Sequence, residues 1–328
     1  MAILDHHNLR QQAASKLDSV PNKGKLVLLY ACVSVGISLA AGIVSMILDG
    51  QIAGTGGLGG MQLRSILATV QSLLNIALFV FVPFWNLGYT SVALKWGREK
   101  AASEKDLLNG FRRFGPGLRL MLLRVVVYLA VGFLVVQVSS IIFTFTPWAE
   151  PFYQQMENIG LLDSVEQLDE AMIEALIPIT IPYWIIAVVL AILAAIPVTY
   201  RLRMAEYRLM DEPQCGALMA MLQSNRMMKG NCLKLFKVDL QFWWYYLATV
   251  LISLLCYGDV LLPLVGVELP LDPMVSFFLF YVASLVALVL LYWRCRNQLE
   301  CTYVCAYDEL SADFVLPAQP QQNNPWQQ

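Results

Sequence analysis

Long apolar stretches, separated by shorter polar ones, recur along the chain from residue 26 to residue 293. A helix needs about 20 mainly apolar residues to cross a bilayer, and each of these stretches approaches or exceeds that length. The pattern therefore predicts six transmembrane helices, at about residues 26–48, 66–94, 118–145, 177–200, 238–257 and 274–293. The predicted fold is all-α and polytopic, with a single six-span membrane domain over residues 26–310.

The positions of Lys and Arg predict how these spans are oriented, because basic residues near span ends tend to stay in the cytoplasm. A cytoplasmic N-terminus places residues 1–25, 95–124, 201–237 and 294–328 inside. These four segments hold all but one of the 22 basic residues, the exception being Arg64. The outer loops are acidic instead. We therefore expect both termini to lie in the cytoplasm.

Composition agrees with a membrane protein, since 58% of the residues are hydrophobic and only 14% are charged. A soluble domain has about a quarter of its residues charged and could not bury this much apolar surface. The last 18 residues, 311–328, are rich in Pro and Gln and predict a disordered cytoplasmic tail.

Two of the inner segments contain patterns typical of short amphipathic helices, which we call the elbow helices. In the first, Ser103 is a candidate N-cap, and Leu107, Leu108 and Phe111 follow at helical spacing. We expect the break Gly115, Pro116 and Gly117 to end it. Each elbow is predicted to lie at the inner interface and to lead into the next span.

The second elbow is predicted to open at Pro213, because proline fits the first turn of a helix. It carries Leu218, Met219 and Leu222, and we expect it to end at Gly230.

Polar residues within the predicted spans are candidates for a function. Gln71 and Asn75 lie one turn apart in the second span, and Arg124 and Gln137 lie in the third. The amides could form hydrogen bonds between helices, and Arg124 could extend back to the inner headgroups. The alternative is that these four residues line a polar pathway through the bundle.

Prolines in two of the predicted spans point to breaks in the helices. Pro83 lies in the second span, and Pro178, Pro182 and Pro197 lie in the fourth. Broken helices occur at transporter binding sites, although prolines also produce simple kinks.

No familiar arrangement of catalytic residues is present, so we expect no enzyme, no cofactor and no metal. The two histidines are the adjacent pair His6 and His7. Cys295, Cys301 and Cys305 would need further ligands, such as Cys215 or Cys232, to make a zinc site. Packing residues at the interface are the simpler interpretation. Basic residues without interleaved stacking aromatics also argue against nucleic acid as a partner.

Short motifs spread over most of the chain carry a resemblance to a known family. They are Asn8-Leu9-Arg10, Gly88-Tyr89, Lys105-Asp106-Leu107-Leu108, Gly110-Phe111, Tyr207-Arg208-Leu209, Asp211-Glu212-Pro213, Gly216-Ala217-Leu218, Met228-Lys229-Gly230 and Leu235-Phe236. With these the chain resembles DUF975, a family of bacterial integral membrane proteins of unknown function. The resemblance implies a bacterial cytoplasmic membrane and supplies no reaction or catalytic residue.

Two functions remain open from the sequence. The first is a non-enzymatic interaction or regulatory protein, whose basic inner loops contact anionic membrane lipid or a protein partner. The alternative is a transporter or permease component that moves a small or lipidic solute.

Overall fold

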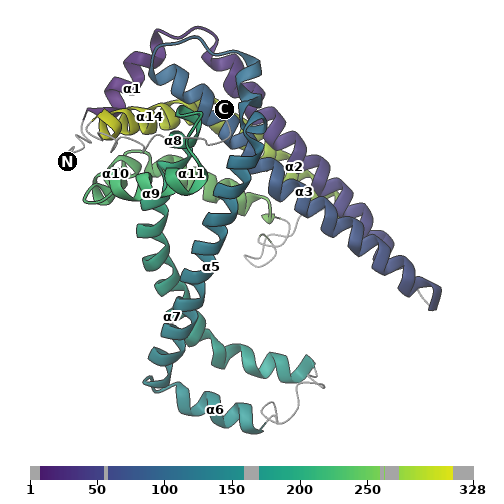
Figure 1. The fold of residues 1–328 in the computed structure, drawn as a ribbon. Coiled ribbons are helices and arrows are strands. Elements are labelled where there is room, and N and C mark those ends of the chain that lie inside the picture. Colours follow the sequence, from purple (N-terminus) through teal and green to yellow (C-terminus); the bar gives the residue numbers. More distant parts are fainter. Residues whose placement is uncertain (1–7, 55–57, 159–169, 259–261, 263–272, 313–328) are drawn as a thin grey trace, which may run out of the picture. The chain divides into compact units, whose positions relative to one another are not determined.

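The computed structural model describes residues 8–54, 58–158, 170–258, 262 and 273–312, and all regular structure within these ranges is helical (Figure 1). The chain forms two compact units. Unit 1 comprises the residues up to Arg119 and those from Met204 onward, and unit 2 comprises Leu120–Arg203.

The long helices match the predicted spans and extend past most of them. They are α2 (Lys23–Gly54), α3 (Leu58–Gly97), α5 (Phe114–Thr144), α7 (Glu170–Leu202) and α13 (Pro273–Leu291). Five helices in the described residues are long and apolar enough to cross a membrane, or six if one bent pair forms a span. The all-α, polytopic fold is confirmed.

The fifth span is the broken one. It consists of α10 (Cys232–Leu240) and α11 (Trp243–Leu255), which meet at an angle of 66°. The 13 residues of α11 reach only about 20 Å, which is short of the ~30 Å hydrocarbon core, so α10 or later residues must complete a crossing.

Of the two alternatives for the prolines in the second and fourth spans, a break in the helix is not found. Helix α3 continues through Pro83, and α7 continues through Pro178, Pro182 and Pro197. A proline removes one hydrogen bond of the helix, and a long apolar helix can accommodate this loss by local adjustment.

Helices also form at both ends of the described chain. Near the N-terminus, α1 (Leu9–Asp18) buries Leu9, Ala13 and Leu17. Beyond α13, a π-helical turn, η3 (Tyr292–Arg296), leads into α14 (Asn297–Ala312). Helices α1 and α14 pack against each other, as Figure 1 shows. Of the predicted disordered tail, residues 313–328 lie outside the described residues, as do His6 and His7.

The first elbow is a short 3-10 helix, η1 (Glu104–Leu108), followed by α4 (Asn109–Arg112). The elbow ends at Arg113, one residue before α5 begins. Gly115, Pro116 and Gly117 therefore occupy the first turn of α5. The prediction that they end the elbow is wrong. Proline suits this place because the first N–H groups of a helix have no partner within it.

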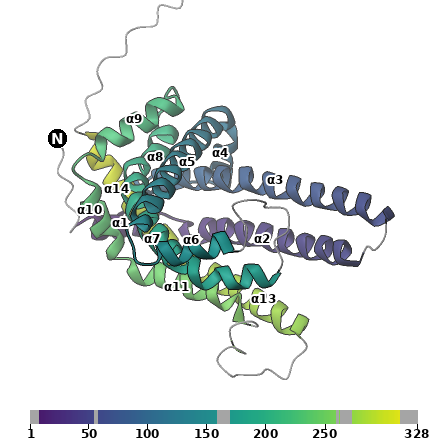
Figure 2. The same cartoon turned by 90° about the horizontal axis from the view of Figure 1, so that it is seen from below.

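The second elbow contains two helices, α8 (Ala205–Asp211) and α9 (Ala217–Met227). The amphipathic part thus begins at Ala217, after Gly216, and not at the predicted Pro213. Gly230 has a φ of +82° and separates α9 from α10, which explains why glycine stands there. Figure 2 shows α9 and α10 from below, in green.

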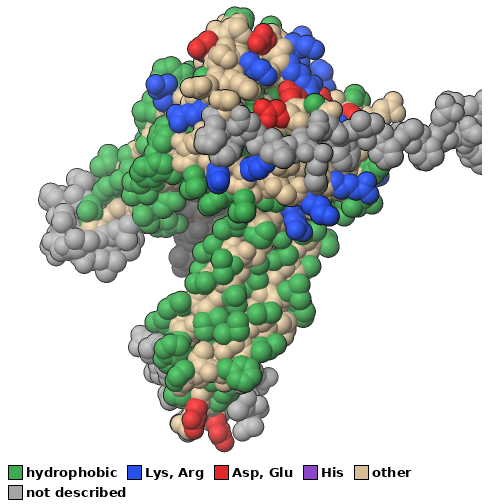
Figure 3. Space-filling view, turned by 90° about the vertical axis from the view of Figure 1, so that its left-hand side faces the viewer, with side chains coloured by type: hydrophobic (Ala, Val, Ile, Leu, Met, Phe, Trp, Pro, Cys, Tyr) green, Lys and Arg blue, Asp and Glu red, His purple; other side chains and the backbone are tan. Residues whose placement is uncertain are grey.

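Unit 2 pairs α7 with the part of α5 that follows residue 120. The ring of Phe143 contacts the rings of Phe152 in α6 (Ala149–Asn158) and Tyr183 in α7, with centroids 5.4 and 5.7 Å apart. At the other end, Arg124 donates a hydrogen bond to the carbonyl of Leu202. Hydrophobic side chains cover these helices in Figure 3.

Candidate functional site

The short helices of unit 1 form a group that we call the head, consisting of α1, η1, α4, α8, α9, α10 and α14. Lys and Arg side chains gather over it in Figure 3. Except for residues 238–240 at the end of α10, its residues come from the four segments that the distribution of Lys and Arg assigns to one side of the membrane. Segments that are distant in sequence, and that the Lys and Arg distribution predicts to share one side of the membrane, thus pack together in the head.

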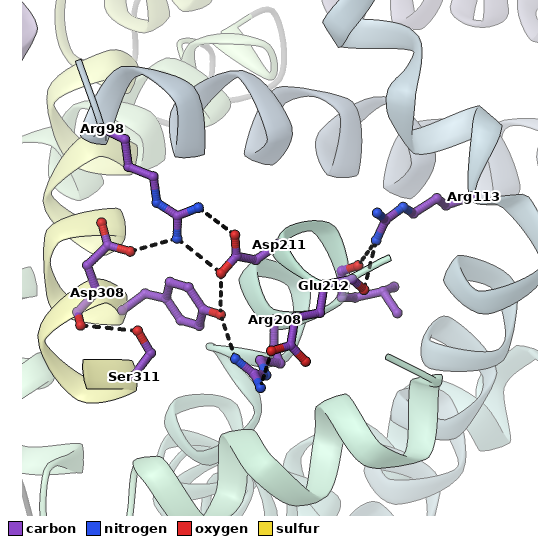
Figure 4. A network of polar contacts seen from close by, with 9 residues as sticks. Arg98, Arg113, Arg208, Asp211, Glu212, Asp308 and Ser311 are labelled. Atoms are coloured by element: carbon purple, nitrogen blue, oxygen red, sulfur yellow. Dashed lines mark hydrogen bonds and ion pairs between the residues drawn. The ribbon is translucent and has the colours of Figure 1, made fainter. Parts of the chain in front are cut away.

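An ion-pair network, centred on Arg98, connects the end of α3 to two helices of the head, α8 and α14 (Figure 4). Arg98, directly after α3, binds both carboxylate oxygens of Asp211 in α8, at 2.5 and 3.0 Å. It also reaches Asp308 in α14, at 2.9 Å. These hydrogen bonds, with Asp211 the strongest, raise the pKa of Arg98 despite partial burial. The fork-shaped guanidinium suits such a double contact.

Arg208 extends the same network toward α9. Its Nε donates to Gln223 at 2.7 Å, and its Nη2 lies 2.5 Å from a carboxylate oxygen of Glu212. Tyr307 bridges the two arginines, because its hydroxyl accepts from Arg208 and donates to Asp211. Each of the two guanidinium groups is therefore paired with at least one carboxylate of the network.

Arg113 joins the first elbow to the second. Its Nη1 donates to the backbone carbonyls of Leu209 and Glu212, which lie at the C-terminal end of α8. A cation at this end of a helix is favourable because the last carbonyls there have no partner within the helix.

The first elbow is fixed to α3 by Asp106. Lys95 donates to this carboxylate at 2.8 Å, and the Ser103 backbone N–H donates at 2.7 Å. Burial would raise the pKa of Asp106, but these hydrogen bonds outweigh it and hold the pKa below its usual value. Ser103 thus caps the elbow, as the sequence predicts.

Two glycines allow the first elbow to touch the backbone of α3. A Cβ on Gly88 would lie 1.7 Å from the carbonyl oxygen of Leu107, and one on Gly110 would lie 2.0 Å from that of Phe84. No side chain fits at either position. The elbow and α3 are therefore in backbone contact.

Residues of α1 and α14 hold the bend between α10 and α11. Arg10 donates to the carbonyl of Gln241 at 3.3 Å and lies over the ring of Phe242, 5.1 Å from its centroid. From α14, the hydroxyl of Tyr303 donates to Asp239. The break in the fifth span is thus supported on two sides.

A second buried polar cluster surrounds the π-helical turn. Arg296 pairs with Glu300 at 2.8 Å, and Glu300 also accepts from the hydroxyl of Tyr207 at 2.5 Å. The hydroxyl of Tyr89 is buried without a hydrogen-bond partner in the described part of the chain. π-Helical turns are rare and often mark functional sites.

Helices α9 and α10 expose apolar and basic side chains together, and we call this the α9–α10 surface. Its exposed apolar residues are Leu218, Met219, Leu222, Leu233, Phe236 and Leu240. Its basic residues are Arg226, Lys229, Lys234 and Lys237, which form no ion pair among the described residues. Residues 213–238 contain no Asp or Glu. The exposed side chains of this surface are therefore mainly basic and apolar, and its one carboxylate, that of Asp239 near the end of α10, accepts a hydrogen bond from Tyr303.

The residues of the predicted polar pathway lie in both units. Gln71 and Asn75 are on α3 in unit 1, whereas Arg124 and Gln137 are on α5 in unit 2. Asn75 and Gln137 are exposed. The guanidinium of Arg124 contacts the Leu202 carbonyl at 2.8 Å, at the end of α7. Whether these residues line a pathway stays a prediction.

The C-terminal cysteines are packing residues of α14 and of the turn before it. Cys295, Cys301 and Cys305 are buried and carry free thiols. In the described ranges, no group of three or more His, Cys, Asp or Glu side chains is arranged to hold a metal ion.

Several residues of the head are not apparent as a site from the sequence. The charges of Arg208, Asp211 and Glu212 indicate only a charged cap, and nothing local links Arg98 to Asp308, 210 positions away. The i, i+4 repeat of Leu9, Ala13 and Leu17 could have indicated α1.

Comparison with known proteins places the chain in a family. The family described as "Protein of unknown function (DUF975)" matches residues 1–289. No curated protein and no solved structure matches the chain significantly. The match covers the spans, both elbows and most of the head, so the chain belongs to the DUF975 family of proteins of unknown function.

Proposed function

We propose that this protein is a non-enzymatic interaction protein of the bacterial cytoplasmic membrane, whose head contacts anionic lipid of the inner leaflet through the α9–α10 surface. The composition of that surface carries the proposal. Exposed apolar side chains suit the acyl boundary, and basic side chains suit anionic headgroups, as in helices that lie in the membrane interface.

The contacts between α1 and α14 support the orientation that the proposal requires. Helix α1 precedes the first span, and α14 continues the last one. Their packing against each other supports an even number of membrane crossings. This favours six spans, with the bent pair α10–α11 counted as one, and both ends on the same side.

The ion-pair network supports a structural rather than a catalytic head. Arg98, Arg208, Asp211 and Glu212 neutralise one another through short contacts. Paired groups of this kind stabilise an arrangement of helices, whereas a catalytic group must remain accessible to a substrate.

The lipid contact can be tested by unfolding the protein in nanodiscs with and without phosphatidylglycerol. We expect the anionic lipid to raise the melting temperature of the wild type. A variant with Arg226, Lys229, Lys234 and Lys237 changed to Gln should lose at least half of that rise, since each cation near the headgroups contributes on the order of 1 kcal/mol.

The matched control changes Lys100 and Lys105 to Gln, because these exposed lysines also belong to unit 1 but lie outside the surface. It should respond to phosphatidylglycerol like the wild type. An equal response of the four-residue variant would reject the α9–α10 surface as the lipid contact.

The broken fifth span favours the second candidate, a transporter or permease component, because discontinuous helices form the substrate sites of many transporters. Single cysteines at Asn75 and Gln137 test it. A water-soluble thiol reagent should label both positions if they line a polar pathway, and should not label Phe133→Cys, which is exposed on the apolar surface of α5. Equal absence of labelling would count against transport.

A further inference from the structure

A pocket in the head lies apart from the α9–α10 surface. It has a volume of about 610 Å³ and lies between α1, the first turn of α2 and the junction of η3 with α14. The residues in its wall that matter here are Asp18, Lys23, Gly24, Trp293, Arg294 and Gln298. It thus lies where the first and last spans meet the head.

The charges of the wall leave one cation available to a ligand. Lys23 is engaged, since its Nζ lies 2.8 Å from Asp18 and donates to the Leu17 carbonyl at 2.9 Å. Arg294 has neither an ion pair nor a hydrogen bond in the described part of the chain, and it is exposed. The wall therefore carries a net charge of about +1, which matches a phosphodiester.

An apolar face of α13 leads directly to this pocket. Val275, Leu279, Val282, Val286 and Leu290 are exposed at helical spacing, and Trp293 follows one turn later at the rim. From Val275 to Leu290 this face is about 22 Å long, more than the ~15 Å depth of one leaflet. Leu28 continues the apolar surface on α2, one turn beyond Gly24.

Trp293 stands at the boundary between these two regions. Its indole Nε1 would lie 3.5 Å from a Cβ at Gly24, so the ring reaches the start of α2. Half of the residue is exposed. Trp prefers the level of lipid headgroups because its ring is apolar and its N–H is polar.

We infer that this pocket binds the phosphate headgroup of one phospholipid, with Arg294 as the phosphate ligand and the exposed face of α13 along the acyl chain. The apolar face favours a lipid over free phosphate. The net charge of the wall and the unpaired guanidinium favour a phosphodiester, and basic pockets between spans are known lipid sites.

The test is native mass spectrometry of the intact protein purified from membranes. We expect the wild type to retain one phospholipid, and Arg294→Gln to retain about ten-fold less, because a charge-assisted contact is lost. Since Arg294 has no protein partner to lose among the described residues, the variant and the wild type should melt at the same temperature once both have been stripped of lipid.

Arg119→Gln is the control, as Arg119 is an exposed arginine at the start of a different span. It should retain the lipid. Equal retention by Arg294→Gln and the wild type would overturn the site. If inorganic phosphate displaces the lipid or binds in its place, the ligand is free phosphate and the lipid assignment fails.

This inference does not depend on the α9–α10 surface, and the same experiment separates the two. The variant with Arg226, Lys229, Lys234 and Lys237 changed to Gln should still retain the single lipid. Loss of the lipid in that variant, with retention in Arg294→Gln, would move the tight site to the α9–α10 surface and reject the pocket.

Discussion

At the scale of single residues, glycines and buried hydroxyls determine how closely the helices of the head approach. Gly88 and Gly110 place the first elbow directly on the backbone of α3. Tyr89 and Tyr207 both bury a hydroxyl, but only that of Tyr207 donates to a carboxylate, at 2.5 Å. For each feature, two variants can therefore be compared that should change the melting temperature differently.

We expect Gly88→Ala to lower the melting temperature strongly. Its Cβ would lie 1.7 Å from the Leu107 carbonyl, and backbone atoms cannot move as a side chain can, so the cost should reach about 1–3 kcal/mol or more. Tryptophan fluorescence during heating in detergent measures this. Gly115→Ala, with nothing within 4 Å, should be neutral or stabilising. Equal melting of the two variants would disprove the backbone contact.

Tyr89→Phe should leave the melting temperature unchanged or raise it, because the hydroxyl that it removes is buried without a partner. Tyr207→Phe should instead destabilise by about 1.5–3 kcal/mol, since a hydrogen bond to a charged group is lost. The same melting experiment compares the two. A large destabilisation by Tyr89→Phe would show that its hydroxyl has a partner.

At the scale of elements, the chain's periodicity determines the long helices, whereas contacts between distant segments determine their breaks. Apolar length predicts α2, α3, α5, α7 and α13 because lipid requires each of them to satisfy its own backbone hydrogen bonds. The prolines do not break α3 or α7. The break occurs at Gln241 and Phe242, where Arg10 and Tyr303 support the bend, and no local pattern announces such contacts.

The candidate site was less predictable than the spans for the same reason. Ser103 and Gly230 are recognisable because a cap and a left-handed turn are local features. Arg98, Asp211 and Asp308 form one network only after three elements have packed together.

The cost of a substitution at Gly230 should depend on its backbone conformation and not on contacts of the new side chain. Its φ is +82°, and a Cβ there would meet nothing within 4 Å. We therefore expect Gly230→Ala to cost about 1–2 kcal/mol, and Gly230→Asn to cost less, because Asn adopts left-handed conformations more readily. Melting temperatures in detergent give the order. If Ala and Asn are equally tolerated, the turn is not strained.

Asp106 should make the stability of the first elbow depend on pH. Its pKa is lower in the folded state than in the unfolded chain, so it stabilises the fold above the unfolded pKa. This contribution is lost as the pH falls through the folded pKa. Melting curves from about pH 7 to about pH 3 should show Asp106→Asn below the wild type at neutral pH, with the gap closing in acid. A constant gap would contradict the assignment.

At the scale of the whole molecule, the head contains both ends of the described chain and the two elbows between spans. Helix α1, before the first span, packs on α14, after the last one. This packing agrees with the prediction from the distribution of Lys and Arg that both segments lie on one side of the membrane.

The topology predicts which positions a membrane-impermeant maleimide can reach in intact cells. In a chain without its native cysteines, Glu157→Cys should be labelled, whereas Lys100→Cys and Ala312→Cys should be protected until the cells are lysed. All three positions are exposed, so protection reports the membrane and not burial. Labelling of both Ala312→Cys and Glu157→Cys in intact cells, while Lys100→Cys stays protected, would indicate five spans.

The pairing of α1 with α14 also has a consequence for how the protein is made. Helix α1 is synthesised before α14, so Leu9, Ala13 and Leu17 lack that packing partner until α14 has been made. A chain that stops before residue 297 leaves that apolar face uncovered and the bend at Gln241 without Tyr303. A chain without α14 therefore differs from one that includes it by an exposed apolar face on α1.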